Sequence, residues 1–307
     1  MVRHYIVFVA AFFALLIAVP AFAQTNDGII GTVLEVEGSG SVTPAGGSEA
    51  TPAAVNMPVH LNDVVQTAPS SRIFILFIDN TQLTLSENAH VSIDDYVFDP
   101  DDNTNNKAAY SVIQGAFQYV SGLIGKRENP DVHIETPVGS IGIRGTDFWA
   151  GNIDSQYGVA VNDGQVALKT DAGEEVVNKG EGTSVQDRHS IPAHAQAWPR
   201  EKFERVASTV RLKRQGLVRR KMRGMQGRQR FLQRRYKNYM VRHRGKNYMA
   251  QHRAAGQKHQ QLQRHEPQKQ MRGGNRNHKQ QMRAGRQKKQ RQKNHPGQQR
   301  KHRQKGD

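Results

Sequence analysis

The sequence predicts an all-β fold, either an antiparallel sandwich or a jelly-roll-like domain, followed by a partly helical, largely disordered basic tail. Short apolar segments recur between turn signals from about residue 28 to residue 185, which is typical of many short antiparallel strands. No helical crossovers separate these segments, as a parallel α/β fold would require. The charge also changes sign: residues 1–200 contain 10 Lys and Arg against 23 Asp and Glu, whereas residues 201–307 contain 34 against 4.

Four segments carry the strand prediction most clearly. Residues 29–36 are rich in β-branched side chains, and residues 72–78 form a continuous apolar run that fits a strand buried on both faces. Residues 162–165 (Asn-Asp-Gly-Gln) lie between two short apolar segments, and Asp-Gly suits the positive backbone angles of a tight turn. We therefore expect a hairpin there, and a second turn at residues 171–173.

The first residues predict an export signal. Arg3 and His4 give a basic start, residues 5–19 contain no charged side chain, and residues 21–23 (Ala-Phe-Ala) place small side chains at alternate positions. This pattern is typical of a signal peptide that is cleaved before Gln24. The alternative is an uncleaved membrane anchor, but the run is short for a bilayer span of ~20 residues. We expect an exported protein in the periplasm or outside the cell.

The predicted organisation has four parts. They are a signal peptide at 1–23, a β domain at 24–190, a linker and possible basic helix at 191–244, and a disordered polycationic tail at 245–307. Apolar residues at three- or four-residue spacing after residue 200 favour some helix, although dense arginine opposes it. Beyond residue 245 too few apolar side chains remain to offset the entropy of ordering.

One segment resembles a known signature. Residues 136–148 (Thr-Pro-Val-Gly-Ser-Ile-Gly-Ile-Arg-Gly-Thr-Asp-Phe) are similar to the turn and strand of the FecR domain family. Segments 61–67, 79–85, 115–122 and 164–166 agree with that family in order, with Asn80 where Gly is usual. The matching signature positions are Thr136, Pro137, Gly139, Arg144, Gly145, Thr146, Asp147 and Phe148.

The resemblance implies an extracytoplasmic all-β domain. In the best-known FecR proteins this domain relays a signal from an outer-membrane transporter to a cytoplasmic anti-sigma segment. Only four residues precede the apolar run of this chain, so we expect no such segment here.

Arg144 has two interpretations. It lies three residues before Asp147, and a buried or partly buried ion pair between them would pin the strand. Alternatively, its guanidinium group recognises an anionic ligand. We favour the structural role, because a turn with an ion pair usually serves the fold.

No enzyme or metal site is predicted. The chain has no cysteine, which excludes disulfides and thiolate chemistry. Asp99, Asp101, Asn103 and Asn105 alternate as calcium ligands do, but Thr104 and Tyr110 occupy the positions where an EF-hand needs Gly and Glu. We interpret this segment as a solvated hairpin tip, and the cluster around His133 as a polar solvent-facing surface. We expect no cofactor.

The basic region carries the strongest functional signal. Its density of Lys and Arg, with aromatic residues interleaved, is typical of polyanion binding. We expect anionic envelope polymers or lipopolysaccharide as partners, and nucleic acid only if it is extracellular. The alternative functions are an extracytoplasmic sensor that docks on a membrane protein, and an extracellular nucleic-acid-binding protein. The predicted polyanion-binding residues are Arg214, Arg219, Arg220, Lys221, Arg234, Arg235, Lys237 and Arg242.

Overall fold

The computed structural model describes residues 28–243, so the predicted signal peptide and the predicted tail at 245–307 lie outside the described residues. The strands are β1 (Ile29–Glu37), β2 (Gly40–Thr43), β3 (Thr51–Pro52), β4 (Pro58–His60), β5 (Val64–Thr67), β6 (Arg72–Phe77), β7 (Gln82–Leu85), β8 (His90–Val97), β9 (Lys107–Gln114), β10 (Phe117–Val120), β11 (Val132–Thr136), β12 (Gly139–Ile153), β13 (Gln156–Lys169), β14 (Glu174–Asn178), β15 (Glu181–Val185) and β16 (Gln196–Ala197). Three helices follow: α2 (Arg200–Val210), α3 (Gln215–Gly224) and α4 (Gln226–His243).

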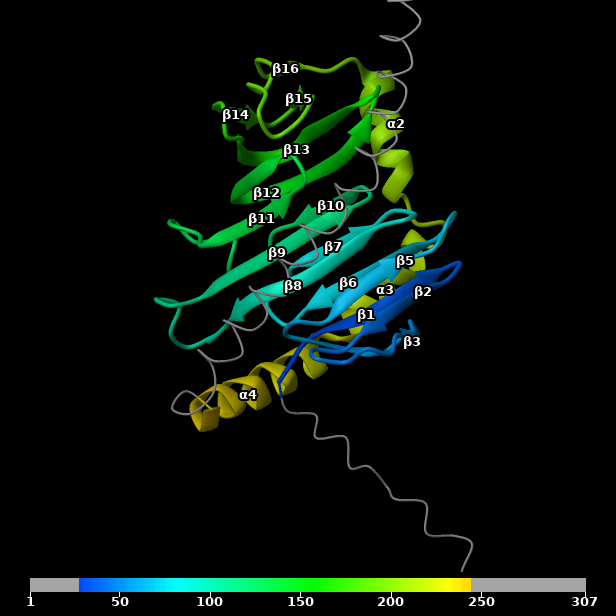
Figure 1. The fold of residues 1–307 in the computed structure, drawn as a ribbon. Coiled ribbons are helices and arrows are strands. Elements are labelled where there is room, and N and C mark those ends of the chain that lie inside the picture. The colour runs from blue at the N-terminus through cyan, green and yellow to red at the C-terminus, as the bar shows by residue number, and fades with distance from the viewer. Residues whose placement is uncertain (1–27, 244–307) are drawn as a thin grey trace, which may run out of the picture. The chain divides into compact units, whose positions relative to one another are not determined.

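The strands form one curled sheet that branches at the long strand β12 (Figure 1). One edge of β12 pairs with β13, and the other edge pairs with β11 near its start and with β10 further along. From β11 the sheet continues through β9, β8, β5, β2 and β3, and from β10 it continues through β7, β6, β1 and β4. Among the described strands only β9 and β11 pair in parallel. The all-β prediction is confirmed.

The two branches face each other across an aromatic core. The ring of Phe77 on β6 lies 5.7 Å from that of Tyr96 on β8 and 5.4 Å from that of Tyr110 on β9. Tyr110 in turn contacts Tyr119 on β10 at 5.8 Å. Since β6 and β10 belong to one branch and β8 and β9 to the other, these rings join the layers into a sandwich.

Strand β6 is buried on both faces, as its apolar run predicts. Ile73, Ile75 and Phe77 point into the sandwich core. Phe74 and Leu76 point outward, because side chains alternate along a strand. There they pack against Leu34 of β1 and against Leu212, Val218 and Met225 in and around α3.

Helix α2 packs on β12 and β13. Val206 and Val210 pack against Trp149 of β12 and Ala160 of β13. The Trp149 indole Nε1 donates to the Thr209 hydroxyl at 2.9 Å. No helix within residues 28–243 is long and apolar enough to cross a membrane.

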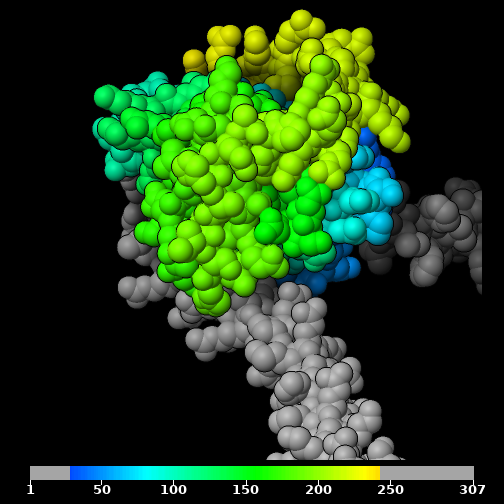
Figure 2. Space-filling model, turned by 90° about the horizontal axis from the view of Figure 1, so that it is seen from above, coloured from blue at the N-terminus to red at the C-terminus, as the bar shows by residue number. Residues whose placement is uncertain are grey.

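Helix α4 belongs to the main core. Leu232 and Tyr236 are buried among the core side chains of both branches. The Tyr236 hydroxyl donates to the carbonyl of Tyr96 at 2.5 Å, and the Gln229 amide donates to the carbonyl of Phe77 at 3.0 Å. Helix α4 thereby closes one end of the sandwich, and the yellow helical residues lie along one side of the strands in Figure 2.

One predicted hairpin is wrong. Strand β13 runs without interruption through residues 162–165. The chain reverses earlier, between β12 and β13, where Asp154 and Ser155 adopt φ of 52° and 64°. Gly164 has φ of 78° and faces another strand closely, since a Cβ there would lie 2.3 Å from the carbonyl oxygen of Gly145. The second predicted turn, at 171–173 between β13 and β14, is confirmed.

Replacing Leu232 with Ala tests whether α4 is part of the core. Removal of a buried leucine should lower the free energy of unfolding by about 2–5 kcal/mol. The neighbouring Phe231 is 56% exposed, so Phe231→Ala should change it by no more than about 0.5 kcal/mol. Urea denaturation of both variants checks this. Equal stabilities would show that α4 does not complete the core.

Candidate functional site

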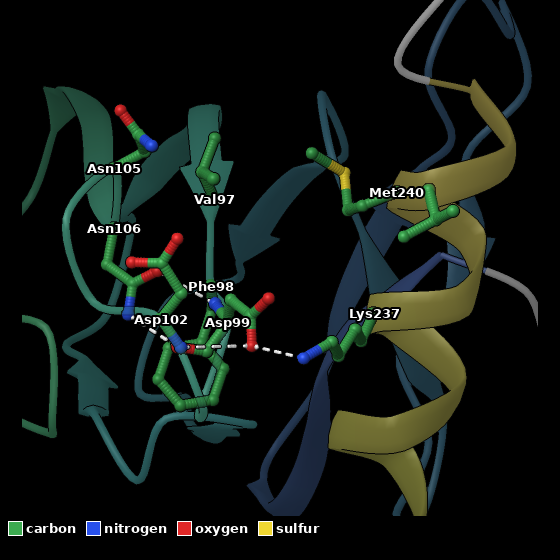
Figure 3. Close-up of a pocket in the computed structure, with 9 residues that line it drawn as sticks. Val97, Phe98, Asp99, Asp102, Asn105, Asn106, Lys237 and Met240 are labelled. Atoms are coloured by element: carbon green, nitrogen blue, oxygen red, sulfur yellow. Dashed lines mark hydrogen bonds and ion pairs between the residues drawn. The ribbon is translucent and has the colours of Figure 1, made fainter.

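The loop between β8 and β9 binds a cation from α4. The carboxylate of Asp99 accepts hydrogen bonds from the backbone amides of Asp101 and Asp102, and the Asn106 side chain bonds to both the amide and the carbonyl of Asp99. Lys237 reaches this loop from α4, and its ammonium lies 3.1 Å from Asp99 (Figure 3). It also lies 2.8 Å from Asp101. The loop is therefore a hairpin tip, as predicted, and its acids face a lysine.

Electrostatics match this geometry. Hydrogen bonds from Lys237 to Asp101 and to Asp99 raise the pKa of the lysine above its usual range. Partial burial acts to raise the pKa of Asp99, but the amide of Asp101 and the Lys237 ammonium outweigh burial and lower it. Within residues 28–243 no group of three or more His, Asp or Glu side chains could hold a metal. His133 pairs with Asp131 on the exposed surface.

A second lysine anchors α3. The Lys221 ammonium lies 2.6 Å from the carboxylate of Glu35 and donates to the carbonyl of Leu34 at 2.8 Å. Glu35 is 3% exposed, and a buried carboxylate requires such a partner. Lys221 and Lys237 therefore hold the helices on the acidic β layer.

The other predicted cations face outward. Arg235 lies over the ring of Phe231, with its guanidinium carbon 5.7 Å from the ring centre. The remaining arginines of the prediction are exposed and have no ion pair with any residue in the range 28–243. They are Arg214, Arg219, Arg220, Arg234 and Arg242.

Three further arginines on the same two helices are exposed. Arg223 on α3 and Arg228 and Arg230 on α4 are also exposed and without an ion pair in the described range. The sequence prediction missed them, although Arg223 and Arg230 lie three or four residues from predicted arginines, and this spacing was the available signal. We call the exposed arginines of the two helices the basic ridge: Arg219, Arg220, Arg223, Arg228, Arg230, Arg234 and Arg242.

A buried aspartate ties three segments of the β sandwich together. Asp79, in the turn between β6 and β7, is fully buried. Its carboxylate accepts hydrogen bonds from the amide and hydroxyl of Thr81 (3.0 and 2.7 Å), the Tyr96 hydroxyl (3.0 Å) and the amide of Ile124 (3.2 Å). Asn80 takes φ of 69° in this turn, a conformation that Asn adopts more readily than most residues. Desolvation raises the pKa of Asp79, although these hydrogen bonds oppose the shift.

The loop that receives Asp79 also shapes the signature strand. Ser121 and Thr146 exchange hydrogen bonds of 2.8 and 2.9 Å, and the Gly145 amide donates to the Gly125 carbonyl at 2.9 Å. Gly145 adopts φ of 60°, within an irregularity in the pairing of β12 with β13. A side chain at this position would be strained. The Arg-Gly-Thr segment is thus a bulge clamped to the loop.

The remaining signature residues lie in a turn and in the core. Pro137 lies in the exposed turn between β11 and β12, and the Thr136 hydroxyl donates to the Gly139 carbonyl across that turn at 2.6 Å. Phe148 is fully buried, and its ring lies 5.7 Å from Phe117 and 5.9 Å from Tyr119.

Comparison with protein families finds a match to "FecR protein" over residues 63–167. The chain carries a FecR domain. The match runs from the turn before β5 into β13, so helices α2–α4 lie outside it. Comparison with curated proteins finds no match.

Two solved structures are similar. Both are crystal structures, at 2.50 and 1.65 Å resolution, of a protein from Parabacteroides distasonis that is assigned as an anti-sigma factor. Each has 12% identity and a TM-score of 0.37, and the alignment covers 46% of this chain. The chain spans 62% of the length of each of these structures.

The predicted ion pair of the FecR signature is absent. Asp147 accepts hydrogen bonds from Gln118 at 2.7 Å and from Asn162 at 3.4 Å. Arg144 is exposed, and its side chain has no hydrogen bond or ion pair with any residue that the structure describes. The ion pair with Asp147 that we favoured as the structural role of Arg144 is therefore wrong, because Asp147 bonds to Gln118 and Asn162 instead.

The buried carboxylate of the FecR domain predicts a pH effect. A raised pKa means that folded Asp79 binds its proton more tightly than the unfolded chain, whose ordinary value is 3.8. Its contribution to stability is full below pH 3.8 and falls as pH rises through the folded pKa. The stability of the native protein minus that of Asp79→Asn should therefore fall from about pH 3.5 toward neutrality in urea titrations.

Tyr96→Phe is the control for this experiment. It removes one hydrogen bond to Asp79, which contributes roughly 1 kcal/mol, but keeps the titrating carboxyl. The pH dependence should persist in that variant. A stability difference between the native protein and Asp79→Asn that grows with pH would contradict the raised pKa.

Proposed function

We propose that this chain is a non-enzymatic scaffold or ligand-binding protein of the cell envelope whose basic surface binds anionic polymers. The observation that carries the proposal is the division among the helix cations. Lys221 and Lys237 pair with carboxylates of the β layer, whereas the arginines of the basic ridge have no acidic partner in the described range. Several ridge arginines lie three or four residues apart, and like charges at that spacing destabilise a helix. Binding of a polyanion would relieve this repulsion.

The composition of the chain after the last arginine of the basic ridge also supports an anionic polymer as the partner. Residues 244–307 contain 19 Lys and Arg against Glu266 and Asp307. Such a density attracts phosphate- or carboxylate-rich polymers such as lipopolysaccharide, and binding releases their counterions. Nucleic acid is a partner under this proposal only outside the cell.

Export is part of the proposal. The basic start, the apolar run and the Ala-x-Ala site before Gln24 support it. N-terminal sequencing of the protein from an envelope fraction should give Gln24 as the first residue. Recovery of a chain that still begins at Met1 from the cytoplasm would contradict export.

Salt dependence tests the polyanion function. Fluorescence anisotropy with labelled duplex DNA, used as a calibrated polyanion, should give a log affinity that falls linearly with log salt. Each neutralised phosphate contributes a slope of about 0.9, so replacing Arg219, Arg220 and Arg223 together with Gln should reduce the slope by about 2.7 if each arginine contacts one phosphate. A flat salt dependence, or preference for one DNA sequence over its scramble, would refute charge-based binding.

The matched control replaces Lys221 and Lys237 with Gln. Both lysines already face carboxylates. The double substitution should therefore lower the stability of the protein, and it should change the slope of log affinity against log salt by less than the triple arginine substitution does. Deletion of residues 201–307 is a poor control, because α4 contributes Leu232 and Tyr236 to the core. Point variants keep the fold and isolate the charge.

A sensor module in transmembrane signalling is the second candidate. The FecR match over residues 63–167 supports it, because that family includes extracytoplasmic signalling domains. A sensor would bind a protein partner through a packed surface, and packed interfaces resist salt better than polyelectrolyte contacts. Pull-down from envelope fractions at about 0.5 M NaCl would retain such a partner and would release a polyanion.

A further inference from the structure

The outer face of α4 combines cations with exposed apolar side chains. Phe231 is 56% exposed and Val241 is 68% exposed. At about 100° per residue, Phe231, Asn238 and Arg242 lie on one side of the helix, turned away from the buried Leu232 and Tyr236. Exposed aromatic surface in a folded protein costs hydration free energy, and here it does not serve the core.

Arginines border this apolar surface. Arg228 and Arg235 lie along one flank of Phe231, and Arg234 lies along the other, all within about one turn. The Arg235 guanidinium already stacks near the Phe231 ring, which shields part of its charge from water. An apolar centre with cationic flanks is the pattern of a surface that meets anionic headgroups and acyl chains together.

We propose that the outer face of α4 docks on an anionic lipid bilayer, with Phe231 and Val241 entering the interface and the basic ridge contacting phosphates. The inference rests on the proposed function, since it names the anionic surface that the ridge meets. The inner face of α4 is occupied by the core, so docking is shallow and the FecR domain stays folded above the membrane.

The shape of the site favours a bilayer over a single nucleic-acid strand. Strand-binding proteins use a groove with successive aromatic platforms. The outer face of α4 is a convex helix surface with one aromatic ring, and Val241 offers nothing on which a base stacks. A flat lipid surface contacts a convex helix along its length, and its headgroup region accommodates both the ring and the arginines.

Tryptophan fluorescence in the full chain tests the orientation. Phe231→Trp places an indole on the outer face of α4, and we call this variant the α4 reporter. Val176→Trp, the β14 reporter, places an indole on the exposed side of β14, where Val176 is 43% exposed. The native protein supplies the background of Trp149 and Trp198. Vesicles contain phosphatidylglycerol with brominated phosphatidylcholine, which quenches an indole at the level of the acyl chains.

The expected result is quenching of the α4 reporter above the native background and no added quenching of the β14 reporter. In the otherwise native chain, Phe231→Ala should weaken partitioning into these vesicles on the order of fivefold, and should leave affinity for heparin within about twofold. Vesicles of phosphatidylcholine alone should bind neither reporter. High salt should release the chain.

Other outcomes overturn the inference in distinct ways. Vesicle binding without added quenching of the α4 reporter, or with equal quenching of the β14 reporter, shows that α4 does not face the membrane and leaves polyanion binding intact. Quenching of the α4 reporter by oligo(dT) but not by brominated lipid assigns the face to single-stranded nucleic acid. If the chain binds neither heparin nor anionic vesicles, the proposed function itself is refuted.

Discussion

The buried carboxylate of Asp79 is the constraint on which the FecR domain depends. A carboxylate removed from water requires several hydrogen bonds, and Asp79 obtains them from its own turn, from β8 and from the loop after β10. Tyr96 thereby connects the two branches of the sheet. The loop fixed by Ile124 then holds Thr146 and Gly145, so the shape of the signature strand follows from the position of one acid.

The same reasoning separates the cations of the helices into two groups. Glu35 and the acids of the β8–β9 loop lie on a β layer with excess negative charge, and each accepts a lysine from a helix. These contacts, with the buried Leu232 and Tyr236, attach a strongly basic segment to the domain. The arginines of the basic ridge do not participate in this attachment, since none of them pairs with an acid within residues 28–243.

Local patterns predicted the sheet but not its irregularities. The run at residues 72–78 predicted a strand buried on both faces. In the structure the core covers one side of this strand and the helices cover the other. Asp163-Gly164 indicated a turn, yet the positive φ of Gly164 serves a close approach to Gly145, and one residue cannot distinguish these uses. Arg144 and Asp147 are near in sequence, but the bulge between them is not visible in the sequence, and Asp147 bonds to Gln118 and Asn162 instead.

The packing of α4 into the core could not be predicted from the sequence for a related reason. Its core contacts come from dispersed residues, Gln229, Leu232 and Tyr236, within a segment dominated by arginine, so apolar periodicity was weak. This arrangement has a thermodynamic consequence. A polyanion that contacts ridge arginines in their helical spacing binds the folded state better than the unfolded state, and therefore stabilises the sandwich. Cations whose spacing does not depend on the fold bind in both states and contribute no such coupling. Under the proposed function, helix α4 has one face in the core and the other toward the ligand, so it would link binding to stability.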